Sequence, residues 1–383
     1  MIILDSSARP GPDPGFAGMT NFLVLCSFAK VSSGDPMMKR FIKQSSCSLL
    51  FYSGLFNFTK FLSSRIKKQA VILCYHRVVR GEPDTYSIPG TQIDIQNFRS
   101  HIKFLLNNFT VIRISDLIER MKEGEKAFDR NYAVLTFDDG FKEGYTNIFP
   151  VLKEFLIPAI FFVSPGNILS GTLSWHDELW HCLNNLNDHT IANLRLEGLD
   201  LPITTEKDKL NAYGTLVKTL SARDPQERTR IISNIKVSLG IANHDLSGKR
   251  FMLDRENLSE MINSGLVEFG AHSMTHPMLS LCTEKQVEYE VRESKIVLES
   301  ILGSPVKYLA YPFGQYTSKT IQAVQKCGYK AAVTTNDGLV APGGDLFVIN
   351  RVNVFRDDTL ESLMTQKMMR LYLKHIFSCI KTK

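Results

Sequence analysis

Short apolar, β-prone runs alternate with segments of helical periodicity along most of this 383-residue chain, and this alternation constrains its fold more than any other feature. Each run has the length of a buried strand, and apolar residues in the segments between recur at helical spacing. Regular alternation of strands and helices is typical of a parallel α/β arrangement. Strands are expected near 70–76, 132–137, 159–164, 266–271, 307–311, 329–334 and 347–354, and helices near 95–108, 145–156, 283–302 and 317–327.

Two of the expected strands lead directly into polar motifs. The run 132–137 ends in the motif Thr-Phe-Asp-Asp-Gly at 136–140, and the run 266–271 precedes His-Ser-Met-Thr-His at 272–276. Pro277 disfavours a helical conformation for the residue before it, so the histidine pair is expected in a loop. Both motifs therefore sit at the carboxyl ends of strands, where α/β enzymes place their active sites.

Two adjacent carboxylates and two histidines four positions apart supply ligands for a divalent metal and leave a base. A catalytic zinc site commonly takes three protein ligands of these types and keeps one position for water. The metal lowers the pKa of that water and polarises a carbonyl, and a second carboxylate can accept the proton. The alternatives are an ordinary Asp-Asp-Gly turn and a histidine pair that binds nothing, but the two motifs together predict a metal site.

These motifs, in this order, resemble those of the polysaccharide deacetylase family, also called the NodB-homology family or carbohydrate esterase family 4. The first family motif is T-F-D-D-G, found at 136–140, and the second is H-[ST]-x-x-H, found at 272–276. Pro-Ala-Ile-Phe-Phe-Val at 158–163 resembles the strand after the first motif, and Leu-Ala-Tyr-Pro-Phe-Gly at 309–314 resembles a third motif. The resemblance implies an α/β fold, an irregular (β/α) barrel of the NodB-homology type with fewer than eight full units, over residues 70–356.

The resemblance also implies a role for each matching residue. Asp138 is expected to be the general base, and Asp139, His272 and His276 are expected to bind the metal. The backbone N–H of Tyr311 is expected to stabilise the oxyanion of the tetrahedral intermediate. The implied metal is zinc, although this set of ligands also suits Co²⁺, Ni²⁺ or Fe²⁺.

The third motif departs from the family pattern. Many members carry an arginine there that orients the base aspartate, and the stretch 309–312 contains none. Arg351, in the β-prone run 347–354, is the expected substitute. The alternative is a surface arginine on an edge strand.

The general acid is a second departure. Many members carry it as a histidine in a C-terminal Leu-x-Ile-His motif, but the only histidine after His276 is His375, in a basic tail. Leu-Cys-Tyr-His at 73–76 has the same form at the start of the domain, as in a circularly permuted branch that includes the poly-N-acetylglucosamine deacetylases. His76 is therefore the expected acid, because a histidine suits proton donation near neutrality. A structural histidine at a strand end is the alternative, and His176 is a weaker competitor.

Charge is concentrated in one short segment. The chain has 45 Lys and Arg against 39 Asp and Glu, a net charge of +6. Residues 37–70 hold seven basic residues and no acidic one, so the remainder is close to neutral and predicts no nucleic-acid partner. Seven cysteines without a CxxC pair indicate neither a zinc ribbon nor a disulfide framework, and weakly favour a reducing environment.

The basic segment 37–69 is also rich in aromatic residues. Its lysine and polar residues make it a poor spanning helix, which usually needs about 20 mostly apolar residues. Basic flanks around an aromatic stretch predict an interfacial helix on an anionic membrane, and therefore a cell-envelope or membrane-associated protein. A non-cleaved signal-like segment and a helix packed on the domain are the alternatives.

The rest of the chain divides into three further parts. Residues 1–36 are expected to be disordered, or to precede the natural start at Met37. Residues 165–256 are expected to form an inserted helical subdomain, with Trp175 and Trp180 either stacking on sugar rings or buried. Residues 357–383 are expected to form a basic amphipathic helix, docked on the barrel or lying on a membrane.

The function expected from these motifs is metal-dependent hydrolysis of N-acetyl groups on an amino-sugar polysaccharide or glycan precursor. One alternative is a catalytically impaired glycan-binding protein on the same fold. Another is a de-N-acylase or deformylase of a nucleotide-linked or lipid-linked sugar. An intact Asp138 argues against pure binding, because a binder needs no base.

Overall fold

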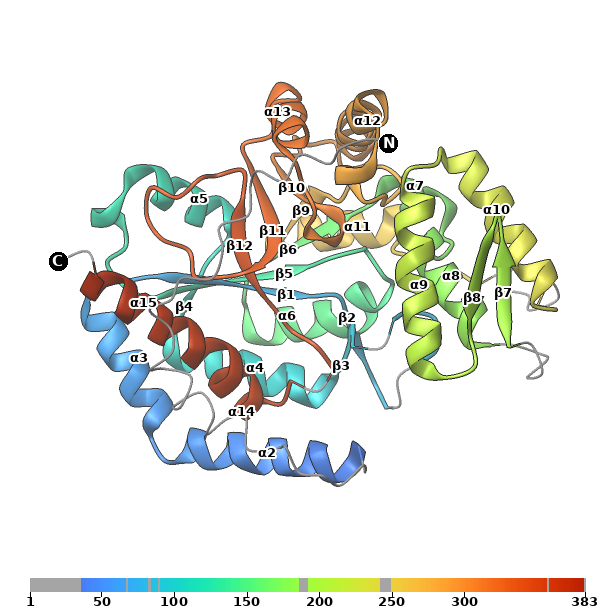
Figure 1. The fold of residues 1–383 in the computed structure, drawn as a ribbon. Helices are drawn as coiled ribbons and strands as arrows, with labels where there is room; N and C mark the ends of the chain where they lie inside the picture. Colours follow the sequence, from blue (N-terminus) through green and yellow to red (C-terminus); the bar gives the residue numbers. More distant parts are fainter. Residues whose placement is uncertain are drawn as a thin grey trace.

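The computed structural model describes residues 36–66, 68–81, 84–88, 90–185, 192–241, 249–356 and 358–381. Its centre is a barrel of parallel strands surrounded by helices (Figure 1). The expectation for residues 1–36 lies outside the described residues, apart from Pro36, at which the first described helix begins.

Seven parallel strands close into the barrel, which confirms the predicted irregular (β/α) architecture. Their order is β1-β12-β11-β10-β9-β6-β5, and β1 closes the ring by pairing with β5 along its whole length. A short strand, β4, extends the sheet beside the start of β5. The barrel strands are β1 Ala70–Tyr75, β5 Tyr132–Phe137, β6 Ala159–Val163, β9 Val267–Ala271, β10 Tyr308–Ala310, β11 Ala331–Asp337 and β12 Ile349–Asn353, with β4 at Thr110–Val111.

Side chains alternate between the barrel interior and the surrounding helices, as the two-residue period of a strand requires. Ile72, Val134 and Ile349 belong to one buried cluster, which includes apolar residues of helix α5 (Ile114–Glu123). Their neighbours Leu73 and Leu135 belong to a second cluster shared with the other helices. On β5 and β12 the next inward positions after this interior cluster belong to polar residues, Thr136 and Arg351.

The helices cover the outside of the barrel, and local signals define their ends. The Asp94 side chain accepts a hydrogen bond from the backbone of Gln96 at the start of α4. Thr283 forms a capping box with Gln286 at the start of α12. The outer helices are α4 Ile95–Asn108, α6 Phe149–Phe155 with a π-helical turn at Gly144–Ile148 before it, α7 Pro165–Ser170, α11 Arg255–Asn263, α12 Glu284–Leu302 and α13 Ser318–Lys326. Short 3-10 turns lie at Glu125–Ala127, Leu279–Leu281 and Pro312–Gly314. Outside the barrel, β2 Arg77–Val79 pairs with β3 Gln92–Asp94.

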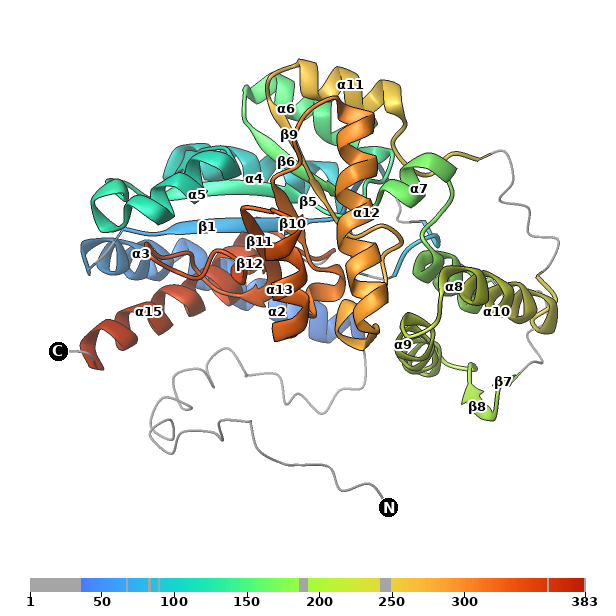
Figure 2. The same ribbon diagram turned by 90° about the horizontal axis from the view of Figure 1, so that it is seen from above.

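The expected insertion lies to one side of the barrel, facing the carboxyl ends of its strands (Figures 1 and 2). It has an apolar core of its own, built around the buried Trp180 and Leu216. An antiparallel hairpin accompanies its helices, which the sequence did not lead us to expect. The elements are α8 Trp175–Asn184, β7 Asn193–Leu196, β8 Leu199–Pro202, α9 Glu206–Ser221 and α10 Pro225–Ser238.

The two ends of the domain pack together below the barrel (Figure 1). Helix α3 (Leu55–Ile66) contacts α15 (Met369–Lys381), and the rings of Phe56 and Tyr372 lie 6.1 Å apart. The C-terminal helix is therefore docked on the domain. The chain reaches it through α14 Leu360–Ser362 and a π-helical turn at Leu363–Met368, and both also contact α2 Pro36–Tyr52.

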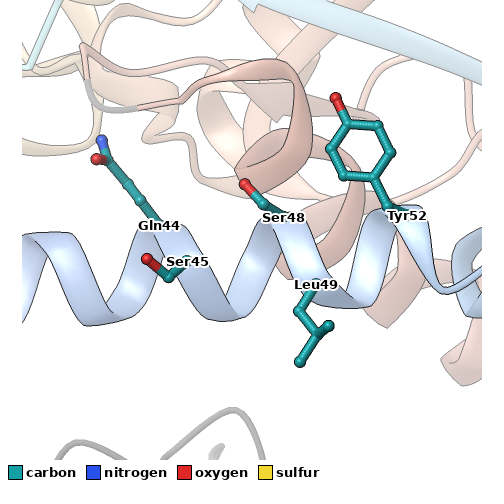
Figure 3. A pocket seen from close by; sticks show the side chains of 5 residues that line it. All are labelled: Gln44, Ser45, Ser48, Leu49 and Tyr52. Atoms are coloured by element: carbon teal, nitrogen blue, oxygen red, sulfur yellow. The ribbon is translucent and has the colours of Figure 1, made fainter.

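Several large apolar and aromatic side chains of α2 and α3 are exposed. Leu49 is 73% exposed and Tyr52 74%, and both line an open pocket on α2 together with Gln44, Ser45 and Ser48 (Figure 3). Phe58 and Phe61 on α3 are also exposed. Across the described residues, no helix is both long and apolar enough to span a bilayer.

Candidate active site

The polar motifs meet at the carboxyl ends of the barrel strands. Asp138 and Asp139 follow β5, His272 follows β9, and His76 follows β1. Both aspartates, His272 and His276 are buried. The structure thus brings together residues that are far apart in the sequence, on the side of the barrel that faces the insertion.

Asp138 forms a bidentate ion pair with Arg351. The two guanidinium nitrogens of Arg351 donate to Oδ1 and Oδ2 of Asp138 at 2.8 and 2.6 Å, and Arg351 has no exposed surface. Burial on its own raises the pKa of Asp138, but the charge and hydrogen bonds of Arg351 together with the nearby His272 and His76 hold that pKa below its ordinary value. The carboxylate is therefore ionised and fixed in orientation, as a general base requires.

The strand order explains how Arg351 reaches the site. Strand β12 is not an edge strand, because it pairs with β1 on one side and β11 on the other. Arg351 lies two residues after Ile349, so it faces the barrel interior. Its remaining donors bind the Thr334 carbonyl at 2.8 Å and the Thr136 hydroxyl at 3.0 Å. Each of the three guanidinium nitrogens thus donates to an oxygen.

Asp139 lies between the two motif histidines. Its Oδ1 is 3.5 Å from Nε2 of His272 and 3.2 Å from Nε2 of His276. Burial alone raises the pKa of Asp139, but the neighbouring histidines, with His276 the strongest, outweigh it and lower that pKa. Burial lowers the pKa of His272 to about 4, so this ring is neutral at neutral pH, the form that binds a metal.

This arrangement fits a divalent metal. Nδ1 of His272 lies 2.7 Å from the Ala310 carbonyl. A carbonyl can only accept, so Nδ1 carries the hydrogen and Nε2 presents a lone pair towards Asp139. Tetrahedral ligands about 2.0 Å from zinc are roughly 3.3 Å from one another, close to the separations of Asp139 from His272 and His276. The backbone carbonyl orients the ring, as the outer contacts of metal sites usually do.

The loops that carry these residues have unusual backbone conformations. Six non-glycine residues of the described chain have a positive φ, and four of them are Asp139, Ser273, His276 and Phe313. Such conformations persist only where the surroundings impose them, and they concentrate at functional sites. Gly140, with φ of +81°, completes the turn after Asp139.

His76 lies beside Asp138. Donor atoms of His76, Cys74 and Asp138 all lie within 4.8 Å of one another. Cys74 is a site residue that the sequence analysis did not identify: its Sγ is 3.5 Å from Oδ2 of Asp138, and burial raises the pKa of its thiol well above the ordinary value. The two-residue period of β1, in which Ile72 faces inward, would have indicated this position.

Tyr311 requires a correction. Its backbone N–H donates to the Val333 carbonyl at 3.1 Å, within the pairing of β10 and β11, so this donor is not free for an oxyanion. Its side chain points away from the histidines and donates to the Phe347 carbonyl at 3.0 Å. Phe313 is the residue of this motif that reaches the site, with its ring 5.0 Å from that of His276.

The insertion contributes to the site through the start of α8. The indole nitrogen of Trp175 donates to the His276 carbonyl at 3.0 Å, and the rings of His176 and His276 lie 4.3 Å apart. Burial lowers the pKa of His176 well below its ordinary value. Trp180 is buried inside the insertion and cannot stack on a sugar, whereas Trp175 is only partly buried.

Comparison with known proteins agrees with the motifs. The family model described as polysaccharide deacetylase matches residues 125–332. A poly-beta-1,6-N-acetyl-D-glucosamine N-deacetylase of Staphylococcus epidermidis is 22% identical over 320 residues, which cover 78% of this chain and 83% of the relative.

Two solved structures share the fold. The Streptococcus pyogenes deacetylase PplD in complex with acetate has a TM-score of 0.53 and 18% identity, covering 79% of this chain and 99% of that one. IcaB from Ammonifex degensii has a TM-score of 0.51 and 19% identity, covering 80% and 97%.

Proposed function

Because the chain belongs to the polysaccharide deacetylase family, and is a hydrolase acting on non-peptide amide bonds, we propose that it removes acetyl groups from N-acetylated amino sugars of a polysaccharide in a metal-dependent reaction. The observation that carries this proposal is the buried, bidentate Arg351–Asp138 pair beside Asp139, His272 and His276. It combines an oriented base with a set of metal ligands at one end of the barrel.

Asp139, His272 and His276 are the proposed metal ligands. A divalent cation bound there supplies a Lewis acid for the acetyl carbonyl and lowers the pKa of water. Zinc suits two imidazoles and a carboxylate, and Co²⁺, Ni²⁺ and Fe²⁺ accept the same set. The Ala310 carbonyl holds the ring of His272 in the orientation that ligation needs.

Asp138 is the proposed general base, and Arg351 positions it. Both carboxylate oxygens accept from the guanidinium and Oδ2 also accepts from the Cys74 thiol, so Oδ1 retains a lone pair for the proton of an attacking water. Arg351, with the nearby histidines, holds the pKa of Asp138 below its ordinary value despite burial, so the base is available before substrate binds. A glycan-binding protein without turnover has no need of this buried pair, and this supports hydrolysis over binding alone.

His76 is the proposed general acid. It lies within 4.8 Å of Asp138 on the neighbouring strand and is only partly buried, so it can reach both the reacting centre and solvent. In the reaction the amide C–N bond breaks, water adds to the acetyl carbon, and the departing amine gains a proton. Donation of that proton from His76 gives a free amino sugar and acetate.

The proposed substrate is a polymer of N-acetylglucosamine. Support comes from the Staphylococcus epidermidis relative, whose name specifies poly-beta-1,6-N-acetyl-D-glucosamine, and from IcaB, whose fold this chain shares. The insertion borders the end of the barrel that holds the proposed site (Figure 2). A deformylase of a lipid-linked or nucleotide-linked sugar is distinguished by release of formate.

We also propose that the enzyme lies on a membrane surface in the cell envelope. The exposed apolar side chains of α2 and α3 lie in the segment that carries seven basic and no acidic residues. An apolar face flanked by positive charge suits the surface of an anionic bilayer.

Acetate release from β-1,6-linked and β-1,4-linked N-acetylglucosamine oligomers tests the function. The wild type, Asp138→Asn and His76→Ala are compared after loading with the same metal. We expect turnover by the wild type and a loss of about 10²- to 10⁴-fold in each variant, with metal content unchanged. Unchanged turnover in His76→Ala would assign the acid elsewhere, and absence of acetate from every oligomer would contradict the proposed substrate.

A further inference from the structure

His176, on the insertion, faces the proposed metal ligands of the barrel. One of its ring nitrogens, a carboxylate oxygen of Asp139 and a ring nitrogen of His276 all lie within 4.8 Å of one another, and all three residues are buried. Ligand atoms of one six-coordinate cation are separated by roughly 3.0 Å when adjacent and 4.2 Å when opposite. The three donors therefore surround a space of the size that a single cation occupies.

The ring of His176 is held in the orientation of a ligand. Its Nδ1 faces the hydroxyl of Tyr213 at 3.4 Å and Oδ1 of Asp177 at 3.7 Å. Its Nε2 is buried and has no hydrogen-bond partner within the described part of the chain. A buried nitrogen without a partner is destabilising, because it has lost its hydrogen bonds to water. One ring nitrogen facing oxygen partners while the other stays free is the usual arrangement of a metal-bound histidine.

Independent contacts fix the insertion to the histidine loop. The Trp175 indole donates to the His276 carbonyl at 3.0 Å, and Arg228 on α10 donates to the Thr275 hydroxyl at 2.5 Å. Arg228 is itself buried and lies over the ring of Trp175. His176 is thus placed by two helices of the insertion, and its distance from His276 does not depend on a free loop.

We propose that His176 is a fourth protein ligand of the metal site, supplied by the inserted subdomain. This inference rests on the proposed metal site and extends it from the barrel to the insertion. Four protein ligands fill a tetrahedral zinc site, whereas a catalytic site keeps a position open. A cation held by all four would need a fifth or sixth position to keep one open for water, and such a site would favour metals that readily adopt those numbers, such as Fe²⁺, Co²⁺ or Ni²⁺.

Cobalt binding tests this assignment without any substrate. Metal-free wild type, His176→Ala and His176→Gln are titrated with Co²⁺ in competition with a chelator, and the visible absorption of each complex is recorded. Asp139→Ala serves as the reference for loss of a ligand. His181→Ala is the matched control, because His181 lies on the same helix but packs against Tyr86.

We expect both His176 variants to bind Co²⁺ at least about tenfold more weakly than the wild type. Their absorption spectra should also change, because the coordination number falls, while His181→Ala keeps the wild-type affinity and spectrum. Wild-type affinity and spectrum in both His176 variants would overturn the inference. Weak binding without a spectral change would also overturn it, because that result assigns His176 to positioning alone.

The same titration separates this inference from the proposed function. If Asp139→Ala loses Co²⁺ while the His176 variants do not, the three-ligand site stands and the fourth ligand is wrong. If Asp139→Ala also binds Co²⁺ like the wild type, the metal site itself is wrong. Circular dichroism of the metal-free proteins identifies a misfolded variant. If His176→Ala is misfolded, the wild type is compared with His176→Gln, which keeps a polar side chain of similar size.

Discussion

Replacement of Arg351 by methionine tests the central ion pair of the site. Methionine is unbranched and flexible, so it fills much of the space of the arginine side chain while the charge is removed. The Asp138 carboxylate stays buried without its partner. Breaking a buried ion pair in this way destabilises a protein by about 3–5 kcal/mol. We therefore expect Arg351→Met to lower the free energy of unfolding by about that amount at neutral pH.

The pH dependence of this loss follows from the pKa of Asp138. In the wild type that pKa lies below its ordinary value, so the ion pair contributes stability at neutral pH and this contribution is lost as the pH falls through the folded-state pKa. Arg351→Met removes the strongest of the interactions that lower the pKa of Asp138, so burial raises that pKa. In the folded variant Asp138 is therefore protonated at a higher pH than in the wild type. The difference in free energy of unfolding between the variant and the wild type should shrink as the pH falls. The acidic limb of kcat/KM should move to higher pH for the same reason.

A double-mutant cycle measures the pair. Urea unfolding is followed for the wild type, Arg351→Met, Asp138→Asn and the double variant. Each single variant leaves one buried group without its partner, whereas the double variant leaves neither, so we expect a coupling energy of about 2 kcal/mol or more. Additivity of the two substitutions within about 0.5 kcal/mol would refute the reasoning.

Three further predictions concern the rest of the fold. Burial lowers the pKa of His101 to about 4 from 6.5. The stability that depends on a neutral His101 is therefore complete above pH 6.5, and about 3 kcal/mol of it is lost as the pH falls to about 4. Urea unfolding of the wild type and His101→Gln across this range measures the difference, and parallel pH profiles of the two proteins would contradict the prediction. Gly314 has φ of +67°, and a Cβ there would lie 2.7 Å from a backbone nitrogen of β11. Gly314→Ala should therefore lower the free energy of unfolding by at least about 2 kcal/mol. Gly303 also has a positive φ but open space around it, so Gly303→Ala should lose less stability in the same assay, and equal losses would refute the packing argument. Replacement of Phe58 and Phe61 by serine should reduce co-sedimentation with anionic vesicles several-fold, because both rings are exposed; binding that survives the double replacement would rule out this face.

The barrel could be predicted because its signals are local. The expected helix at 95–108 and strand at 132–137 match α4 and β5 in both bounds, since a capping aspartate marks one and an uninterrupted apolar run marks the other. The hairpin β7–β8 was missed although leucines alternate with polar residues or proline in both strands. Each strand has only four residues, which is too short for this alternation to predict a strand within a region of helical character.

The site could be predicted only where its residues follow a strand directly. Asp138 and His272 were identified because each follows an apolar run, and the carboxyl ends of parallel strands lie together. The contact between Arg351 and Asp138 depends on the strand order of the closed barrel, which no local pattern contains. His176 faces His276 across 100 positions of the chain, so its place depends on how the insertion packs against the barrel.

Closure of the barrel and assembly of the site depend on the first strand of the domain. Strand β1 pairs with β5 on one side and β12 on the other, and these three strands carry His76, Asp138 and Arg351. The match to the family model covers 125–332, so it includes the base and the proposed metal ligands but neither His76 nor Arg351. A barrel without β1 would expose unpaired edges on β5 and β12 and admit water to the buried ion pair. The residues outside the family match are therefore needed to keep the base both oriented and dry.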